Sequence, residues 1–201
     1  MAVDHAAFDR ELLDQLRQGR VADAATSAVK TYGAEIYALF ASIHRSEQDA
    51  AEVFSVFCER LWRGLPRFEG RSLFRTWAYT VAWHASSGFR RRQLANREVP
   101  VLDEEFEEMV QKVRTSTTTR LRREKRSRLR ELRETLPPED QALLVLRVER
   151  ELDWKDLARV MNPESDLDEK DLVREAARLR KRFQIVKERL RELVRADSAG
   201  E

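Results

Sequence analysis

The sequence predicts an all-α protein built from two small helical domains joined by a flexible linker. Charged residues make up 37% of the chain, whereas there are only 6 Gly and 5 Pro, fewer turn residues than a strand-rich fold would need. Apolar residues recur at spacings of three and four, and the composition changes sharply near the middle of the chain. We therefore expect helical domains at residues 1–92 and 128–201 and a linker at residues 93–127.

The first domain is predicted to contain successive amphipathic helices. Apolar residues follow helical spacing through residues 8–16, again through 32–40 and again through 53–61. Gly19 is expected to end the first helix, because glycine tolerates the positive φ of a helix terminus. The third helix is expected to stop at the chain breaker Gly64.

The next segment, FRTWAYTVAWHASSGFRRR, is predicted to be a helix rich in aromatic residues and arginines, and it contains no carboxylate. One face is expected to be core, and it comprises Phe74, Trp77, Ala78, Val81 and Ala85. Tyr79 and Trp83 are four residues apart on another face, which continues to Arg90. Exposed rings beside arginines would suit single-stranded nucleic acid, because bases stack on the rings and guanidinium groups meet phosphates. A solvated arginine end on an amphipathic helix is the alternative.

The predicted linker combines the acidic run DEEFEE, the polar tract TSTTT and the basic run RLRREKRSRLR. We found no apolar periodicity between residues 93 and 120, so this part is expected to be mobile.

The second domain is predicted to start with a helix that stops at Pro137. In the following helix, Glu139 and Asp140 complement the helix dipole, and Asp153 is a candidate N-cap for residues 154–161. The tail has an apolar seam whose gaps alternate between four and three residues, formed by Leu172, Ala176, Leu179, Phe183, Val186, Leu190 and Leu193. Such a seam requires one long helix with a buried stripe. Its short length favours packing against residues 139–160 over a coiled coil with a partner.

The net charge, the Cys and His residues and the apolar runs limit the classes of function that we expect. The net charge is only +2, so any nucleic-acid affinity must come from local patches. Cys58 lies in an apolar run and is expected to be a reduced core residue, whereas His5, His44 and His84 lack ligand-like spacing. We expect no enzyme activity, metal, cofactor or small-molecule substrate. No apolar run of membrane-spanning length occurs and the first residues lack a signal-like apolar stretch, so we expect a cytoplasmic protein without a membrane partner.

The order of these pieces resembles a known family. DAAEVFSVFCERLWRGLPRFEGRSLFRTWAYTVAWHASSGFRRR resembles region 2 of bacterial sigma-70 family factors, specifically the extracytoplasmic-function (ECF) group. LPPEDQALLVLRVERELDWKDLARVM resembles the start of region 4, and RFQIVKERLREL resembles the end of its recognition helix. The resemblance covers nearly the whole chain apart from the linker.

This resemblance implies a promoter-specificity subunit that directs core RNA polymerase, and an anti-sigma factor is a further candidate partner. The implied polymerase-clamp contacts are Asp49, Glu52, Val53, Ser55, Val56 and Glu59. The implied contacts to the melted minus-ten element of promoter DNA are Arg71, Tyr79, Trp83, His84, Arg90, Arg91 and Arg92. The implied contacts to the duplex minus-thirty-five element are Arg174, Arg178, Lys181 and Arg182.

The chain departs from the family pattern at several of these positions. Ser55 and Val56 replace a polar Gln-Glu pair on the clamp-docking helix. His84 and Gly88 replace Asn and Asp on the promoter-melting helix, and His does not pair with a base edge as Asn does. The segment 162–181 is longer than in the family and rich in acids, so the DNA contacts are expected near its end. The alternative functions are a helical adaptor or coiled-coil interaction protein and a helix-turn-helix repressor.

Overall fold

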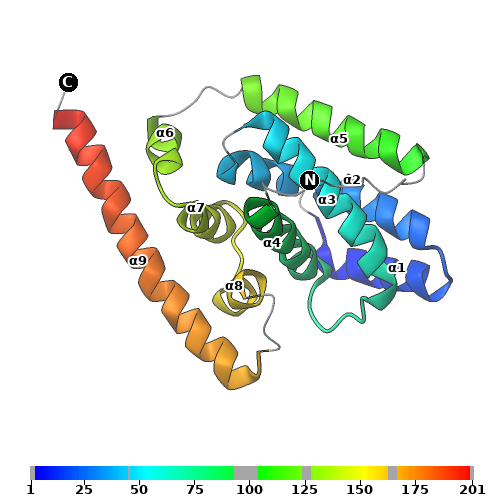
Figure 1. Cartoon of the computed structure of the whole chain (residues 1–201). Helices are drawn as coiled ribbons and strands as arrows, with labels where there is room; N and C mark the ends of the chain where they lie inside the picture. Colours follow the sequence, from blue (N-terminus) through cyan, green and yellow to red (C-terminus); the bar gives the residue numbers. More distant parts are fainter. Residues whose placement is uncertain (1–2, 45, 93–103, 124–127, 163–166, 200–201) are drawn as a thin grey trace.

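The computed structural model describes residues 3–44, 46–92, 104–123, 128–162 and 167–199. Every regular element within these residues is a helix, which confirms the all-α prediction. Figure 1 shows a block of helices from the N-terminal half beside a smaller group from the C-terminal half, with one long helix along the edge of the molecule.

The N-terminal half follows the predicted order of helices. Its elements are α1 (His5–Arg17), α2 (Val21–Ile43), α3 (Glu47–Gly64), the short 3-10 turn η1 (Leu65–Arg67) and α4 (Phe74–Arg92). Gly19 has a φ of +73° between α1 and α2, as predicted for a residue that ends a helix. Ser46 caps α3, since its hydroxyl accepts a hydrogen bond from the backbone N–H of Asp49.

The prediction of a mobile linker is wrong for residues 104–123, which form helix α5 (Glu104–Arg123). Phe106, Val110 and Thr117 are buried, and the Phe106 ring meets the Trp62 ring of α3 in an edge-on contact at 4.8 Å between centroids. The apolar residues of α5 do follow helical spacing, but they stand among acids and threonines, which hid the stripe. The two ends of the predicted linker, 93–103 and 124–127, lie outside the described residues.

The C-terminal half consists of short helices packed against one long helix. Its elements are α6 (Arg128–Glu134), α7 (Pro138–Leu144), the π-helical turn η2 (Val145–Glu149), α8 (Trp154–Met161) and α9 (Glu169–Ala199). Asp153 caps α8 as predicted, because its carboxylate accepts from the Asp156 N–H at 2.8 Å. In the α9 seam, Leu172, Ala176, Leu179 and Val186 are buried against α6, α7 and α8, so the seam packs within the chain.

The two halves share one hydrophobic core. A single cluster of buried side chains runs from Leu12 in α1 to Leu179 in α9. Helix α4 lies against α8, and α2 lies against α7. The contact between the halves therefore determines which side chains of α4 are accessible.

Candidate nucleic-acid interface

Helix α4 is the element that carries the predicted minus-ten contacts, and its start is fixed by another helix. The Asp9 carboxylate of α1 accepts a hydrogen bond from the Phe74 N–H at 3.0 Å. Burial raises the pKa of Asp9, while the bond from Phe74 and the nearby His5 act in the opposite direction. Asp9 thus satisfies a free N–H at the first turn of α4, as an N-cap residue would.

The predicted core face of α4 is confirmed for three of its five residues and holds partly for the others. Phe74, Ala78 and Ala85 are buried, whereas Trp77 and Val81 are partly exposed and pack against the edge of the core. The Trp77 ring covers Gly64, where an added Cβ would lie only 3.0 Å from the indole. This contact gives the glycine at the end of α3 a packing role.

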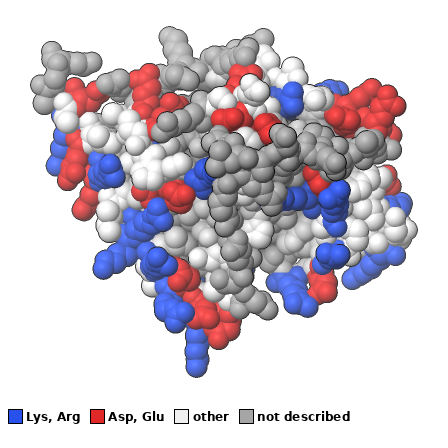
Figure 2. Space-filling model, viewed as in Figure 1, with Lys and Arg blue, Asp and Glu red and all other residues white. Residues whose placement is uncertain are grey.

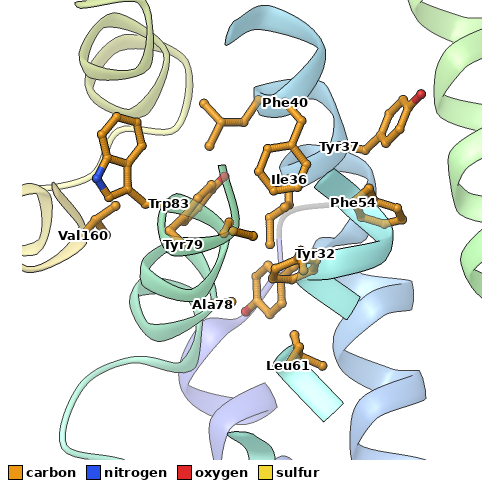
Figure 3. Close-up of a cluster of buried hydrophobic side chains, with 14 of the residues drawn as sticks. Tyr32, Ile36, Tyr37, Phe40, Phe54, Leu61, Ala78, Tyr79, Trp83 and Val160 are labelled. Atoms are coloured by element: carbon orange, nitrogen blue, oxygen red, sulfur yellow. The ribbon is translucent and has the colours of Figure 1, made fainter. Parts of the chain in front are cut away.

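The prediction that Tyr79 and Trp83 form an exposed platform is wrong for this structure. Tyr79 is 0% exposed and Trp83 is 7% exposed. Figure 3 shows the Trp83 indole pointing from α4 towards Val160 of α8. The second aromatic face of α4 is therefore covered by the C-terminal half, and helical spacing within α4 gave no information about that neighbour.

Arg75 is a site residue that the sequence reasoning missed. Its guanidinium pairs with both carboxylate oxygens of Glu35 in α2, at 3.0 and 3.1 Å. It also donates to the carbonyl oxygen of Arg150 at 2.9 Å and lies over the Tyr79 ring, 5.6 Å from its centroid. Arg75 precedes Tyr79 by four residues, and this helical spacing was the signal that could have identified it.

Arg90 also binds the C-terminal half. Its guanidinium pairs with Glu139 at the start of α7 at 2.9 Å and lies 5.4 Å from the centroid of the Trp83 ring. The structure thus brings Arg90 and Trp83 together, as the sequence predicted, but on a covered face. The side chains of Arg91 and Arg92 lie outside the described residues.

The remaining predicted minus-ten residues lie at the margins of this face. Arg71 is exposed in the loop before α4 and pairs with Glu69 at 2.7 Å. His84 is partly exposed on α4. A Cβ at Gly88 would lie 3.5 Å from the Arg60 guanidinium of α3, an ordinary contact distance, so space does not require glycine there.

His44 is a partly buried histidine close to this face. Its Nε2 lies 3.0 Å from the Ser86 hydroxyl of α4, and its ring packs edge-on against Phe89. Burial, reinforced by the charge of Arg90, lowers the pKa of His44 to about 4. The imidazole is therefore neutral at pH 7, and it acts as a packed polar group that links the end of α2 to α4.

The predicted polymerase-docking residues of α3 divide into exposed and buried positions. Glu52 is exposed, and Asp49 and Glu59 are partly exposed, with Glu59 paired to Arg63 at 2.8 Å. Ser55 is partly buried and donates to the Ala51 carbonyl oxygen.

Val53 and Val56 do not belong to the accessible surface of α3, which corrects their assignment. They are 0% and 6% exposed, respectively, because they face the apolar core. The exposed stripe of α3 is therefore defined by its acidic and polar side chains.

The predicted minus-thirty-five residues lie on α9. Arg174, Arg178 and Lys181 are exposed and fall on one face of the helix, but Arg174 pairs with Asp171 at 2.7 Å and Arg178 with Glu175 at 3.5 Å. Figure 2 shows Lys and Arg side chains gathered with acidic ones along the lower left edge, where α9 runs. This face remains available to a phosphate backbone.

Arg182 differs from the other three, because it pairs with Asp140 of α7 at 2.6 Å and is only partly exposed. It holds α9 to α7, which corrects its placement on the same free face. Sequence reasoning also missed Trp154 of α8, whose ring lies beneath the guanidinium groups of Arg147 and Arg180. Arg147 belongs to η2 and Arg180 to α9, so these two cation–π contacts join α8 to both elements.

Two further features of the described residues concern membranes and metal ions. None of the described helices is both long and apolar enough to cross a membrane. Within the same residues, His, Cys, Asp and Glu side chains form no group that could hold a metal ion.

A comparison with protein families matches part of the chain. Residues 28–95 match the family model for sigma-70 region 2, a span that includes most of α2 and all of α3 and α4. No curated protein matches the chain. The match lies on the helices that carry the candidate docking and minus-ten residues. This part of the chain is therefore similar to sigma-70 region 2, which supports a sigma-70 family sigma factor.

Proposed function

We propose that the chain is a sigma factor of the extracytoplasmic-function group, which binds core RNA polymerase and directs promoter recognition and opening. The observation that carries the proposal is the region 2 match over residues 28–95. The order of the C-terminal helices, with capped α8 followed by α9, supports a region 4-like helix-turn-helix. In this proposal the protein works in the cytoplasm, contributes no catalytic residue and uses polymerase for the chemistry.

The proposed division of labour assigns two surfaces to the N-terminal half and one to the C-terminal half. Exposed acids of α3, including Glu52, meet the polymerase clamp. The aromatic and arginine face of α4 meets the unpaired bases of the minus-ten element, because stacking requires bases that are free of their partners. Exposed Arg174, Arg178 and Lys181 of α9 meet the duplex minus-thirty-five element, where side chains on a helix can reach the major groove.

A helical adaptor is the weaker candidate. Its main support was the α9 seam, and that seam is occupied by α6, α7 and α8. A partner helix would have to displace this packing before it could pair with α9.

Co-purification with bacterial core polymerase, followed by run-off transcription, tests the proposal. A sigma factor should co-elute with core enzyme and support initiation, whereas an adaptor or a repressor should do neither. Charge reversal of Asp49 and Glu52 to Lys should weaken the complex. Charge reversal of Glu188 and Glu192, which are exposed on α9, is the matched control and should leave it intact.

A further inference from the structure

Helix α9 carries a second row of cations beside the row that contains Arg174 and Lys181. Arg180, Lys187 and Arg191 follow one another at gaps of seven and four residues, so their side chains lie along one side of the helix. Arg180 and Arg191 are exposed, and Lys187 is partly exposed. Figure 1 shows α9 along the edge of the molecule, where a row of cations can meet a large partner.

This second cation row contacts an aromatic pair that joins α8 to α9. The guanidinium carbon of Arg180 lies 5.7 Å from the centroid of the Trp154 ring. The Lys187 Nζ lies 5.5 Å from the centroid of the Phe183 ring. The two rings are in edge-on contact at 5.6 Å between centroids, and the guanidinium carbon of Arg147 in η2 lies 4.9 Å from the Trp154 centroid. Three cations therefore surround one pair of rings.

The two rows of α9 differ in how their charges are paired. Arg174 and Arg178 of the first row each pair with a carboxylate one turn earlier in the helix. Among the described residues, Arg180 and Lys187 of the second row form no ion pair with a carboxylate. Neighbouring cations repel one another, and an anion placed among them relieves that repulsion. The second row is therefore the part of α9 that gains most from a phosphate.

The beginning of α9 has the opposite charge. Residues 168–175 hold four acids and two cations, whereas residues 180–195 hold seven cations and two acids. Glu169, in the first turn, pairs with Lys155 of α8. Helix-turn-helix proteins place the N-terminal residues of the second helix against the base edges. Acids at that end repel the phosphate backbone, so the cationic middle of α9 suits duplex DNA and its first turn does not.

Gln184 lies between the two rows of cations. It follows Arg180 by four residues and Lys181 by three, and its side chain is exposed. The major groove of DNA admits one helix with a phosphate backbone on either side. Within that groove, the amide of a glutamine can bond both N6 and N7 of adenine. The arrangement thus offers cations to both backbones and an amide to the bases between them.

We propose that α9 enters the major groove of duplex DNA through its middle rather than through its N-terminal end. Arg180, Lys187 and Arg191 contact one phosphate backbone, the first row faces the other, and Gln184 bonds an adenine between them. This inference rests on the proposed function, to which it adds a second row of phosphate contacts and a base-reading residue. Gln184 stands fifteen residues after Glu169, which is about 22 Å along the helix axis, so the contact is centred well beyond the acidic first turn.

The salt dependence of binding tests the phosphate contacts. The variant Arg180→Gln/Lys187→Gln removes two cations of the second row. The matched control, Arg10→Gln/Lys30→Gln, removes one Arg and one Lys from exposed positions of α1 and α2 and has the same net charge. Each full-length protein is assembled with core polymerase, and binding of the holoenzyme to a duplex promoter is measured by fluorescence anisotropy at several salt concentrations. The slope of log K against log salt should become shallower by about 1.8 in the row variant and stay unchanged in the control.

A duplex library with a randomised upstream segment tests base reading. Selection with the wild-type holoenzyme should enrich adenine at the position that Gln184 contacts. Gln184→Ala should lower that enrichment about tenfold, the scale of one bidentate contact to a base, and should leave the other positions unchanged. Gln111→Ala, at an exposed position of α5, is the matched control and should select the wild-type sequence.

Two results would overturn the inference. An unchanged salt slope in Arg180→Gln/Lys187→Gln would remove the second row from the duplex interface, and an unchanged selected sequence for Gln184→Ala would exclude base reading. If circular dichroism shows that the double variant is unfolded, Arg191→Gln tests the row on its own, because Arg191 is exposed and lies outside the ring cluster. We expect its slope to become shallower by about 0.9.

Failure of the proposed function gives a different result. The wild type would then form no holoenzyme with core polymerase, whereas failure of this inference leaves holoenzyme formation intact in every variant. Without a holoenzyme, the same salt slopes measured for the free full-length chains on the duplex decide the inference.

Discussion

Helices α4 and α9 each have one packed face and one face with candidate nucleic-acid contacts, but the second face is buried in α4 and exposed in α9. On α4 that face holds Tyr79 and Trp83, whose rings lose contact with water when another helix covers them. On α9 it holds Arg174, Arg178 and Lys181, which stay in water. Large rings favour burial by any available apolar neighbour, whereas charged groups oppose it. The aromatic face of α4 is therefore covered within the chain, whereas the charged face of α9 stays open to solvent.

The largest expected effect on the free energy of unfolding comes from the buried aromatic face of α4. Trp83→Ala should lower the free energy of unfolding by about 3–5 kcal/mol, because it leaves a cavity between α4 and α8. Val173→Ala, at an exposed apolar position of α9, should change it by less than about 0.5 kcal/mol. Urea denaturation followed by far-UV circular dichroism measures both. Equal small effects would mean that α8 does not cover α4 in solution.

Loss of the polar contacts of α4 should have the next largest effect on the free energy of unfolding. Arg75→Met removes the two hydrogen bonds to Glu35 and the one to the Arg150 carbonyl oxygen. It should lower the free energy of unfolding by about 2–3 kcal/mol. Arg71→Met is the control, because the Arg71–Glu69 pair is exposed and should contribute less than about 1 kcal/mol. Thermal and urea unfolding should rank the two variants in this order. The reverse ranking would contradict the role of Arg75 in joining the halves.

His44 should make the free energy of unfolding depend on pH by a similar amount. Its pKa in the folded protein, about 4, lies below the ordinary value of 6.5, so the unfolded chain binds more protons between these values. Stability from the neutral imidazole is therefore complete above pH 6.5 and is lost as the pH falls towards 4. At pH 5 the loss should reach about 2 kcal/mol relative to pH 7.5.

His44→Gln isolates this contribution. Asp9 and Asp156, whose pKa values are raised by burial, act in the opposite direction, but both remain in the variant and cancel in the difference. The wild type should lose more stability than His44→Gln between pH 7.5 and pH 5, measured by urea denaturation at each pH. Parallel pH profiles would contradict a neutral, partly buried His44.

The smallest effect on stability is expected on the exposed face of α9. Arg174→Ala/Arg178→Ala should change the free energy of unfolding by less than about 0.5 kcal/mol. It should nevertheless reduce the salt dependence of holoenzyme binding to a duplex promoter by about one phosphate contact per arginine. Arg17→Ala, which breaks an exposed pair on α1, is the control and should change neither quantity. An unchanged salt slope in the double variant would remove α9 from the duplex interface.

Local sequence patterns were enough to predict the positions of most helices and the core stripe of several of them. It predicted α4 at its observed bounds, the helix end at Gly19, the Asp153 cap of α8 and the seam of α9. These features depend on residues within one helical turn of each other, so local spacing and local hydrogen bonding are enough to specify them.

Which helix covers a second face of another helix depends on the tertiary structure. The stripe of α5 that includes Phe106 was hidden among acids, and it became recognisable once α2 and α3 supplied a surface for it. The burial of Tyr79 and Trp83 depends on α7 and α8, and the pairing of Arg75 depends on Glu35 of α2 and Arg150 after η2. Such contacts join residues far apart in the chain, and the spacing within one helix carries no information about its partner.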